Sequence, residues 1–350
     1  GIRTLQEIDA GGDNIAIGTD ALADSHTGNR NIAIGYRAIY DGDTSGNDNI
    51  AIGTEALEDA TTASGSIAIG HGAAKQHTTG NGNIAIGSGS MGAGIAAAGV
   101  DTDGQNTAVG PFSLKDLTQG ARNVAIGYKA AEQLTVAHGN IAIGDRAMFD
   151  GVVSGENNIA IGKLALKNTT SAASNIAIGY RALRDTVQTA ERNIAIGNQV
   201  AYDGILVGLD NILMGTETAT AATSLAQNVV IGHKAVLTGV MTGDNNTVLG
   251  SEAAQIITSG ADNVIIGHNA GSKTLTTNTN NILIGSRPSA SAALDNAYAI
   301  GNQALVTQAN SMVLGSKTGE RFRIGMGGIT TVSYTHLRAH ETVLDLVCRL

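Results

Sequence analysis

The sequence predicts an all-β fold, a parallel β-solenoid in which one short unit repeats along the chain. A five-residue motif recurs 18 times, and most copies are 17 or 18 residues apart. In most copies two β-branched residues stand two apart, as in a strand with one apolar face. Repeats of this length are typical of solenoids, because a single unit is too small to bury its own apolar face.

The composition supports thin, regular coils rather than a compact core built on aromatic residues. The chain has 350 residues with 47 glycines, no tryptophan and only 3% aromatic residues. Glycine at this frequency without a collagen period indicates tight turns at fixed places. The net charge is −9, the acidic residues are scattered along the chain, and there is no stripe of basic residues. Nucleic-acid binding is therefore not expected. No run approaches roughly 18 apolar residues, so membrane insertion in this segment is not expected either.

The repeated motif is Asn-Ile-Ala-Ile-Gly, as at Asn31 to Gly35. Asn stands four residues before the glycine in 15 of the 18 copies, and the exceptions are Ser66, Ala297 and Ser311. We expect the Asn and Gly of each copy to be the structural residues of the repeat. Representative pairs are Asn14 and Gly18, Asn31 and Gly35, Asn49 and Gly53, Asn83 and Gly87, Asn123 and Gly127, Asn140 and Gly144, Asn158 and Gly162, Asn175 and Gly179, and Asn193 and Gly197.

Each motif is predicted to form a short strand that ends at its glycine. In Ile32-Ala33-Ile34 the two isoleucines point to one face of the strand and the alanine points to the other. The small alanine side chain implies that this second face has little room. Gly35 permits backbone angles that are closed to other residues, or a close approach of strands. The asparagines either bond their own backbone or stack in a ladder. We expect the isoleucines to be buried, and the first examples are Ile15, Ile17, Ile32, Ile34, Ile50 and Ile52.

The residues after each glycine predict a turn and a second, short apolar segment. Ala38 and Ile39 show the usual pattern, a small residue three positions after the glycine followed by an apolar one. The polar stretch 41–48 that follows has the composition of a variable loop. Stacking 18 coils about 4.8 Å apart would give a rod of roughly 85 Å. The 23-residue spacing before Gly110 predicts a surface loop around Gly92 to Gly104.

The run of these motifs, from about Asp13 to Thr318, resembles the head repeat of YadA-like trimeric autotransporter adhesins, which also occurs in bacteriophage tail fibres. The resemblance implies a left-handed parallel β-roll in which three chains lie side by side. It also implies that small middle residues such as Ala16 and Ala33 face the trimer interior. The coils here are longer than those of a typical adhesin head, which leaves the shape of the outer turn open.

Homotrimerisation is also expected from the row of middle residues. Early copies carry small residues in this slot, namely Ala16, Ala33, Ala51, Ala68 and Ala85. Later copies carry larger apolar residues there, namely Leu213, Val230, Val248, Ile265 and Leu283. If the slot faces outward, these side chains would be exposed on a monomer and covered in a trimer.

The chain divides into four parts. Residues 1–12 are expected to be an incomplete N-terminal lead-in, and residues 13–318 the solenoid. Residues 319–331 resemble the short β segment that joins a repeat shaft to a C-terminal trimerising region in phage tail fibres. Residues 332–350 resemble a translated sequencing adapter, with a genuine short C-terminal helix as the alternative. If the adapter interpretation holds, His336, His340 and Cys348 are not candidates for catalytic or metal-binding residues.

No catalytic, cofactor-binding or metal site is expected. The remaining histidines lack metal-ligand spacing and are expected on the surface, namely His26, His71, His77, His138, His233 and His268. The stretch Asp41 to Gly46 begins like a calcium loop, but Ile52 stands where a bidentate Glu is needed. Three pairs that follow motif glycines are candidates for receptor contact or for ordinary surface packing, namely Tyr36-Arg37, Tyr128-Lys129 and Tyr180-Arg181.

Two other classes of solenoid fit the sequence less well. A hexapeptide-repeat acyltransferase is also a left-handed parallel β-helix, but it needs an apolar residue every six positions. Counting by sixes from Ile17 gives Ala23 and Asn29, so only one position in three keeps that pattern. An ice-binding solenoid would need a flat row of Thr in one strand slot, whereas the Thr residues here lie mostly in variable loops.

These observations predict a structural or adhesive protein rather than an enzyme. Stacked coils give length and stiffness without the concave pocket that small-molecule sites need. Polar loops on a regular scaffold are where recognition can vary. We expect the shaft or head of a homotrimeric fibre, in a virion tail fibre that attaches to a host cell-surface glycan or protein receptor. The alternative is the head of a bacterial trimeric autotransporter adhesin, at the cell surface or outer membrane.

Overall fold

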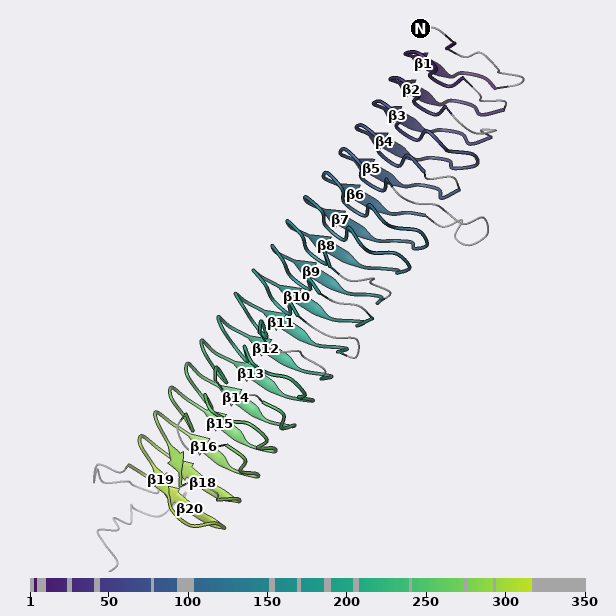
Figure 1. Ribbon diagram of the computed structural model, residues 1–350. Coiled ribbons are helices and arrows are strands. Elements are labelled where there is room, and N and C mark those ends of the chain that lie inside the picture. The colour runs from purple at the N-terminus through teal and green to yellow at the C-terminus, as the bar shows by residue number, and fades with distance from the viewer. Residues whose placement is uncertain are drawn as a thin grey trace, which may run out of the picture.

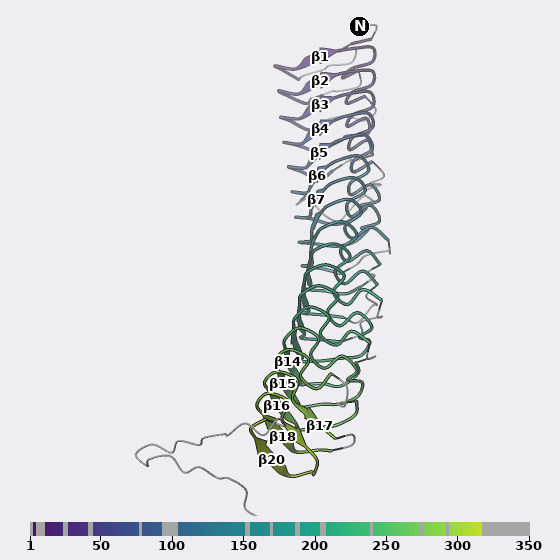
Figure 2. The same ribbon diagram turned by 90° about the vertical axis from the view of Figure 1, so that its left-hand side faces the viewer.

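The computed structural model is a long rod of stacked coils, with the N-terminus at one end and β20 near the other (Figures 1 and 2). The structure describes residues 3–4, 11–23, 27–40, 45–76, 79–92, 104–150, 155–168, 171–185, 190–203, 208–238, 241–272, 276–291 and 294–316. The tip of the predicted insertion loop at 93–103, the junction at 319–331 and the tail at 332–350 lie outside these residues, as does most of the lead-in.

Strand formation follows the repeated motif. Within the described residues there is no helix, and 18 strands form one parallel sheet, one strand for each motif copy. Each of these strands ends directly before a motif glycine, which confirms the predicted placement. They are β1 (Ile15–Ile17), β2 (Ile32–Ile34), β3 (Ile50–Ile52), β4 (Ile67–Ile69), β5 (Ile84–Ile86), β6 (Thr107–Val109), β7 (Val124–Ile126), β8 (Ile141–Ile143), β9 (Ile159–Ile161), β10 (Ile176–Ile178), β11 (Ile194–Ile196), β12 (Ile212–Met214), β13 (Val229–Ile231), β14 (Thr247–Leu249), β15 (Val264–Ile266), β16 (Ile282–Ile284), β18 (Ala297–Ile300) and β20 (Ser311–Leu314). A second, two-stranded sheet joins β17 (Ser289–Ala290) to β19 (Leu305–Val306).

The strands stack in register, each residue beside its equivalent in the next coil. Ile32 pairs with Ile50 and Ala33 with Ala51, and the same parallel pairing continues to the last pair, β18 with β20. Backbone hydrogen bonds join the coils at both ends of each strand; the Gly53 N–H, for example, donates to the Ile34 carbonyl at 2.8 Å. The chain is therefore a parallel β-solenoid, in which each coil is stabilised by its two neighbours.

Left-handed backbone angles fold each coil back under its own strand. In the coil of β2 they occur at Arg30 (φ 56°), Arg37 (φ 53°) and Ile39 (φ 49°), and equivalent residues recur along the chain. Such angles are unfavourable for residues other than glycine. The N–H groups of Arg37 and Ile39 donate to the carbonyls of Thr19 and Ala56 in adjacent coils, at 3.1 and 3.0 Å. Hydrogen bonds between coils thus stabilise turns that an isolated coil would disfavour.

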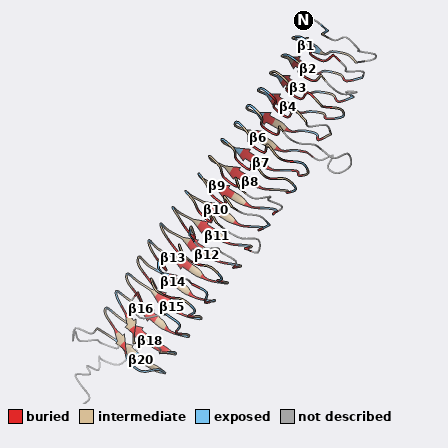
Figure 3. Cartoon of the chain, viewed as in Figure 1, coloured by how far each residue is buried: buried red, intermediate tan, exposed pale blue. Residues whose placement is uncertain are grey.

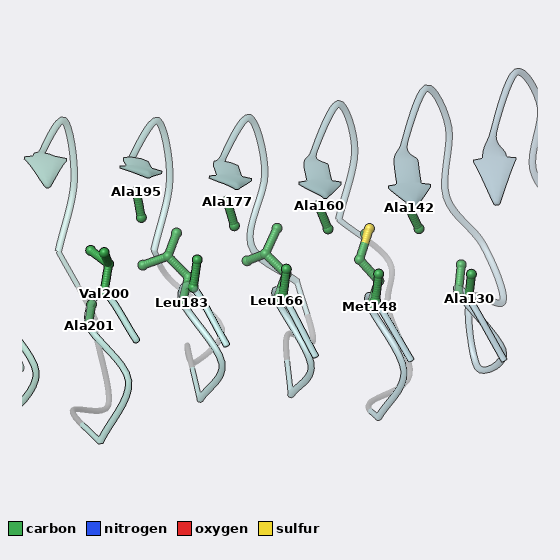
Figure 4. Packing of buried hydrophobic residues seen from close by; sticks show 14 of the residues in the cluster. Ala130, Ala142, Met148, Ala160, Leu166, Ala177, Leu183, Ala195, Val200 and Ala201 are labelled. Carbon is green, nitrogen blue, oxygen red and sulfur yellow. The ribbon is translucent and has the colours of Figure 1, made fainter. Parts of the chain in front are cut away.

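The core lies between the strand and the return segment of the same coil. Figure 4 shows Ala142 and Ala160 pointing from their strands toward the return segments that carry Met148 and Leu166. All four side chains are buried. In the coils of β1 to β15, residues three and four after the motif glycine therefore supply the second side of a core that is only two side chains thick.

Side-chain sizes on the two sides of this core are complementary. In the coil of β9 the middle residue of the strand is Ala160, and the fourth residue after the glycine is Leu166. In the coil of β12 the sizes are exchanged, with Leu213 in the strand and Ala219 in the return segment. Because each coil pairs one Ala with one Leu, the summed side-chain volume of the two positions is the same in both coils, and both can be close-packed.

This arrangement corrects the predicted orientation of the strands. Ile15, Ile17 and Ile52 were expected in the core, but they are 51%, 58% and 37% exposed, and Ile32, Ile34 and Ile50 are only half-buried. The middle residues were expected to face partner chains, but they point into their own coil, and Figure 3 shows buried segments in the strands of the large sheet. Ala16 is half-buried and the others are buried, namely Ala33, Ala51, Ala68, Ala85, Leu213, Val230, Val248, Ile265 and Leu283. The reason is that the left-handed turns bring the return segment against the face that carries the middle residues.

The complementary packing predicts a coupled pair of substitutions. Ala160→Leu should lower the free energy of unfolding by about 1–3 kcal/mol through overpacking, and Leu166→Ala by about 2–5 kcal/mol through a cavity. The double variant reproduces the arrangement of Leu213 and Ala219, so it should lose less than the sum of the two single losses. Urea unfolding of the four proteins measures this coupling, and strictly additive losses would contradict the packing described here.

Candidate assembly surface

The outward face of the large sheet carries two rows of apolar side chains, which we call the isoleucine face. The rows are the residues three and one before each motif glycine, for example Ile141 and Ile143 in β8. The most exposed members, at 36–58%, are Ile15, Ile17, Ile52, Ile69, Ile86, Ile126, Leu249, Met312 and Leu314. A contiguous row of exposed apolar side chains is a candidate interaction surface.

The isoleucine face also has the composition of an interface core. No charged residue occupies either row in the 18 strands of the described sheet. The polar groups in the rows are the hydroxyls of Thr107, Thr247 and Tyr298. Depletion of charge at the centre of a patch is what distinguishes buried interfaces from ordinary protein surface. The face is therefore suited to contact other chains along its whole length.

The motif glycines form a column beside the isoleucine face. At Gly35 φ is 137°, and an added Cβ would lie 2.4 Å from the carbonyl oxygen of Gly53. A side chain here would collide with the backbone of the next coil. Glycine is thus needed both for the backbone angle and for the close approach of coils.

The motif asparagines form a buried ladder, which is one of the two arrangements the sequence left open. The Asn175 N–H donates to Oδ1 of Asn158 at 3.0 Å, and Nδ2 of Asn158 donates to the Ala172 carbonyl at 2.8 Å. The same backbone-to-side-chain bond recurs from Asn31 onward. Ser66 continues the ladder with longer bonds, since its Oγ accepts from the Asn83 N–H at 3.3 Å and donates to the Gly80 carbonyl at 3.4 Å.

The candidate chemical residues do not gather into a site in the described part of the chain. His138 accepts a hydrogen bond from the Ala121 N–H through Nδ1 at 3.2 Å, and His268 lies against the Asn269 amide. Among the described residues, no three His, Cys, Asp or Glu side chains are grouped to hold a metal ion, and no helix is long and apolar enough to cross a membrane. His26, His77 and most of the predicted calcium-like loop lie outside those residues.

The Tyr-Arg and Tyr-Lys pairs lie at the turn directly after the motif glycines. The Arg37 guanidinium lies over the rings of Tyr36 and Tyr40, 5.3 and 4.7 Å from their centroids. Arg181 stacks in the same way on Tyr180, at 4.7 Å. Tyr36 is still 43% exposed, so these clusters are held together by cation–π contacts and remain open to solvent.

A cluster of ion pairs occupies the neighbouring surface. The Lys75 ammonium lies 2.6 Å from a Glu55 oxygen and 2.7 Å from a Glu58 oxygen. The hydrogen bond from Lys75 lowers the pKa of the Glu55 carboxyl. The hydrogen bonds to Glu55 and Glu58 in turn raise the pKa of the Lys75 ammonium.

In comparisons with known proteins, no protein-family model and no curated protein matches the chain at a significant level. The fold and its surfaces therefore carry the functional argument.

The asparagine ladder predicts that its amides contribute directly to stability. Asn158→Ala would leave the Asn175 N–H and the Ala172 carbonyl buried without their present partners, at a cost of about 1–3 kcal/mol for each group. Ser66→Asn should restore the short bonds and raise the melting temperature. Glu156→Ala, at an exposed neighbouring position, is the control and should change little. A melting temperature for Asn158→Ala equal to that of the control would contradict the ladder's role.

The ion-pair cluster predicts an acid-sensitive contribution to stability. Because the pKa of folded Glu55 is lowered, its contribution is present above the unfolded value of about 4.3 and is lost as the pH falls through the lower folded value. The melting temperature of Glu55→Gln should therefore fall less than that of the parent when the pH is lowered from 6 to 3. Glu217→Gln, whose carboxylate lies 3.7 Å from Lys234, is the control. Equal losses in parent and Glu55→Gln would count against the Lys75 interaction.

Proposed function

We propose that this chain is the shaft or head of a homotrimeric fibre that attaches to a cell surface. The observation that carries the proposal is the isoleucine face, an apolar surface without charge that runs past all 18 strands of the described sheet. A monomeric rod would expose this face to water over roughly 85 Å. Association through the isoleucine face removes that cost and produces a stiff rod.

Three chains are favoured by the resemblance of the Asn-Ile-Ala-Ile-Gly array to the head repeats of trimeric adhesins and phage fibres. The contact surface in this proposal is the isoleucine face and not the row of middle residues, because Ala33 and Leu213 are buried inside their own coils. Three copies of a flat, narrow sheet face can close around one axis, so that each face is covered and no apolar row remains free.

Within this proposal, a virion tail fibre is the favoured location and a bacterial trimeric autotransporter adhesin is the alternative. In both, the solenoid holds a recognition surface away from the particle or cell, and the partner is a host cell-surface glycan or protein. The variable polar loops and the exposed Tyr36 and Tyr180 lie on the coils away from the inward core and supply surface that can differ between fibres. Antibodies against the rod should label tail tips of virions in the first case and intact bacteria in the second.

The proposal assigns no catalytic turnover to the described residues. The hexapeptide-repeat acyltransferase stays a remote alternative, supported only by its related coil architecture. Acetyl transfer from acetyl-coenzyme A, or hydrolysis of a surface polysaccharide, by the purified protein would overturn the non-enzymatic assignment. Loss of that activity on substitution within residues 13–316 would be needed to attribute it to the solenoid.

The isoleucine face predicts a specific effect of charge on assembly. The double variant Ile126→Asp and Ile143→Asp places two carboxylates in the centre of the face, where burial of unpaired charge is unfavourable. Light scattering should give a trimer for the parent and a monomer for this variant. Val136→Asp is the matched control, because Val136 is 44% exposed but lies outside the strands, and it should stay trimeric. A parent that is monomeric at all concentrations would overturn the proposed assembly.

A further inference from the structure

A notch interrupts the row of side chains on one edge of the rod. In the described coils, the second residue after the motif glycine has a left-handed φ and usually carries a side chain, as at Glu55 and Phe112. Two consecutive coils between them have glycine in this position, Gly72 and Gly89. The resulting hollow has a volume of about 260 Å³ and is bounded by Glu55 and Lys75 toward one end and by Phe112 and Lys115 toward the other.

The backbone alone does not require these two glycines. Gly72 has φ 61° and Gly89 has φ 63°, while Glu55 and Phe112 adopt φ 57° and 59° in the same row with full side chains. A Cβ at Gly72 would meet no atom within 4 Å, and one at Gly89 would lie 3.0 Å from the Phe112 ring. Gly72 therefore leaves open space on the surface and Gly89 makes room for the Phe112 ring, whereas the motif glycines avoid a collision with backbone.

One wall of the notch is aromatic. The Phe112 ring borders Gly89 and meets Tyr128 of the next coil edge-to-face, with centroids 6.3 Å apart and an interplanar angle of 77°. Tyr128 is 41% exposed, so the apolar surface continues from the notch onto the rod. An aromatic surface next to an open hollow provides a platform for the C–H face of a flat ligand.

The remaining wall offers hydrogen-bond donors and acceptors with balanced charge. Lys75 is bonded to Glu55 and Glu58, so its charge is compensated. Lys115 lies 3.7 Å from Asp116 and 3.8 Å from Glu132, beyond hydrogen-bond distance, and its side chain is 41% exposed. Its ammonium can thus donate to a ligand, while the Glu55 carboxylate can accept.

We propose that the notch between Glu55 and Phe112 binds one unit of a neutral surface saccharide. A pyranose has an apolar C–H face that can stack on Phe112 and hydroxyls that donate and accept, which matches Glu55 and Lys115. The balance of ammonium and carboxylate groups favours a neutral sugar over a uronic acid. The volume is below the roughly 300–1,000 Å³ of sites for drug-sized ligands, so it suits a single sugar of a longer chain.

This inference rests on the proposed attachment function and adds a recognition site on the shaft itself. It differs from a passive spacer, because the rod would contact the cell surface along its side. Contact through one sugar is weak, but three notches in a trimer would act together on a polysaccharide. The site and the assembly can fail separately: a trimer without saccharide binding would overturn only the site, and a monomer that binds would overturn only the trimer.

The test uses the full chain and a panel of neutral oligosaccharides built from glucose, galactose, mannose, rhamnose and N-acetylglucosamine. Saturation-transfer NMR should detect binding of at least one neutral probe at millimolar concentration. Gly72→Gln fills the notch in a row where Gln199 adopts φ 55°, so it should fold normally and weaken binding at least tenfold. Phe112→Ala should weaken it similarly, whereas Gln199→Ala, in the same row on another coil, should leave it unchanged. Circular dichroism and melting temperature check that each variant is folded.

Three results would overturn the site. One is the absence of binding to every neutral probe by the assembled protein, which includes the case in which another copy covers the notch. Another is binding that persists in folded Gly72→Gln and Phe112→Ala. The third is preference for polygalacturonate over all neutral probes, with loss of binding in high salt, because that result would show recognition of negative charge.

Discussion

The structure depends on backbone hydrogen bonds between successive coils. Most coils have only 17 or 18 residues in which to form a strand, reverse and return, and they do so through left-handed turns at residues such as Arg37 and Ile39. Those angles are unfavourable for a single coil, but the turn N–H groups find acceptors in the adjacent coils. Stability is therefore cooperative along the rod, and no coil is expected to hold its shape alone.

The motif residues serve this stacking rather than a chemical site. An asparagine amide binds backbone groups of adjacent segments at the start of most strands, and the glycine column lets coils approach closely at the strand ends. Both contacts repeat from coil to coil, so they impose one register on the whole array. The polar loops that follow the return segments carry no such requirement, so they can differ in length from coil to coil.

The solenoid has three surfaces of different character. The inward side of the sheet packs against the return segment, with sizes exchanged between positions such as Ala160 and Leu166 or Leu213 and Ala219. The outward side is apolar and without charge, which suits association with other chains. The edge after the motif glycines carries aromatic and charged side chains, which suits recognition of a ligand. Side chains on the two outer surfaces can thus change without disturbing the core.

The sequence by itself determined where the strands begin and end, their parallel stacking and the positions of Asn and Gly in the repeat. The alternation in Ile32-Ala33-Ile34 defined two faces, but only the tertiary structure decided which face is inward. The inward face is the one against which the return segment folds. The direction of that fold is set by left-handed backbone angles at residues such as Arg37 and Ile39, whose residue types do not predict such angles. The notch likewise emerged only on stacking, because it joins Gly72, Gly89 and Phe112 from three successive coils.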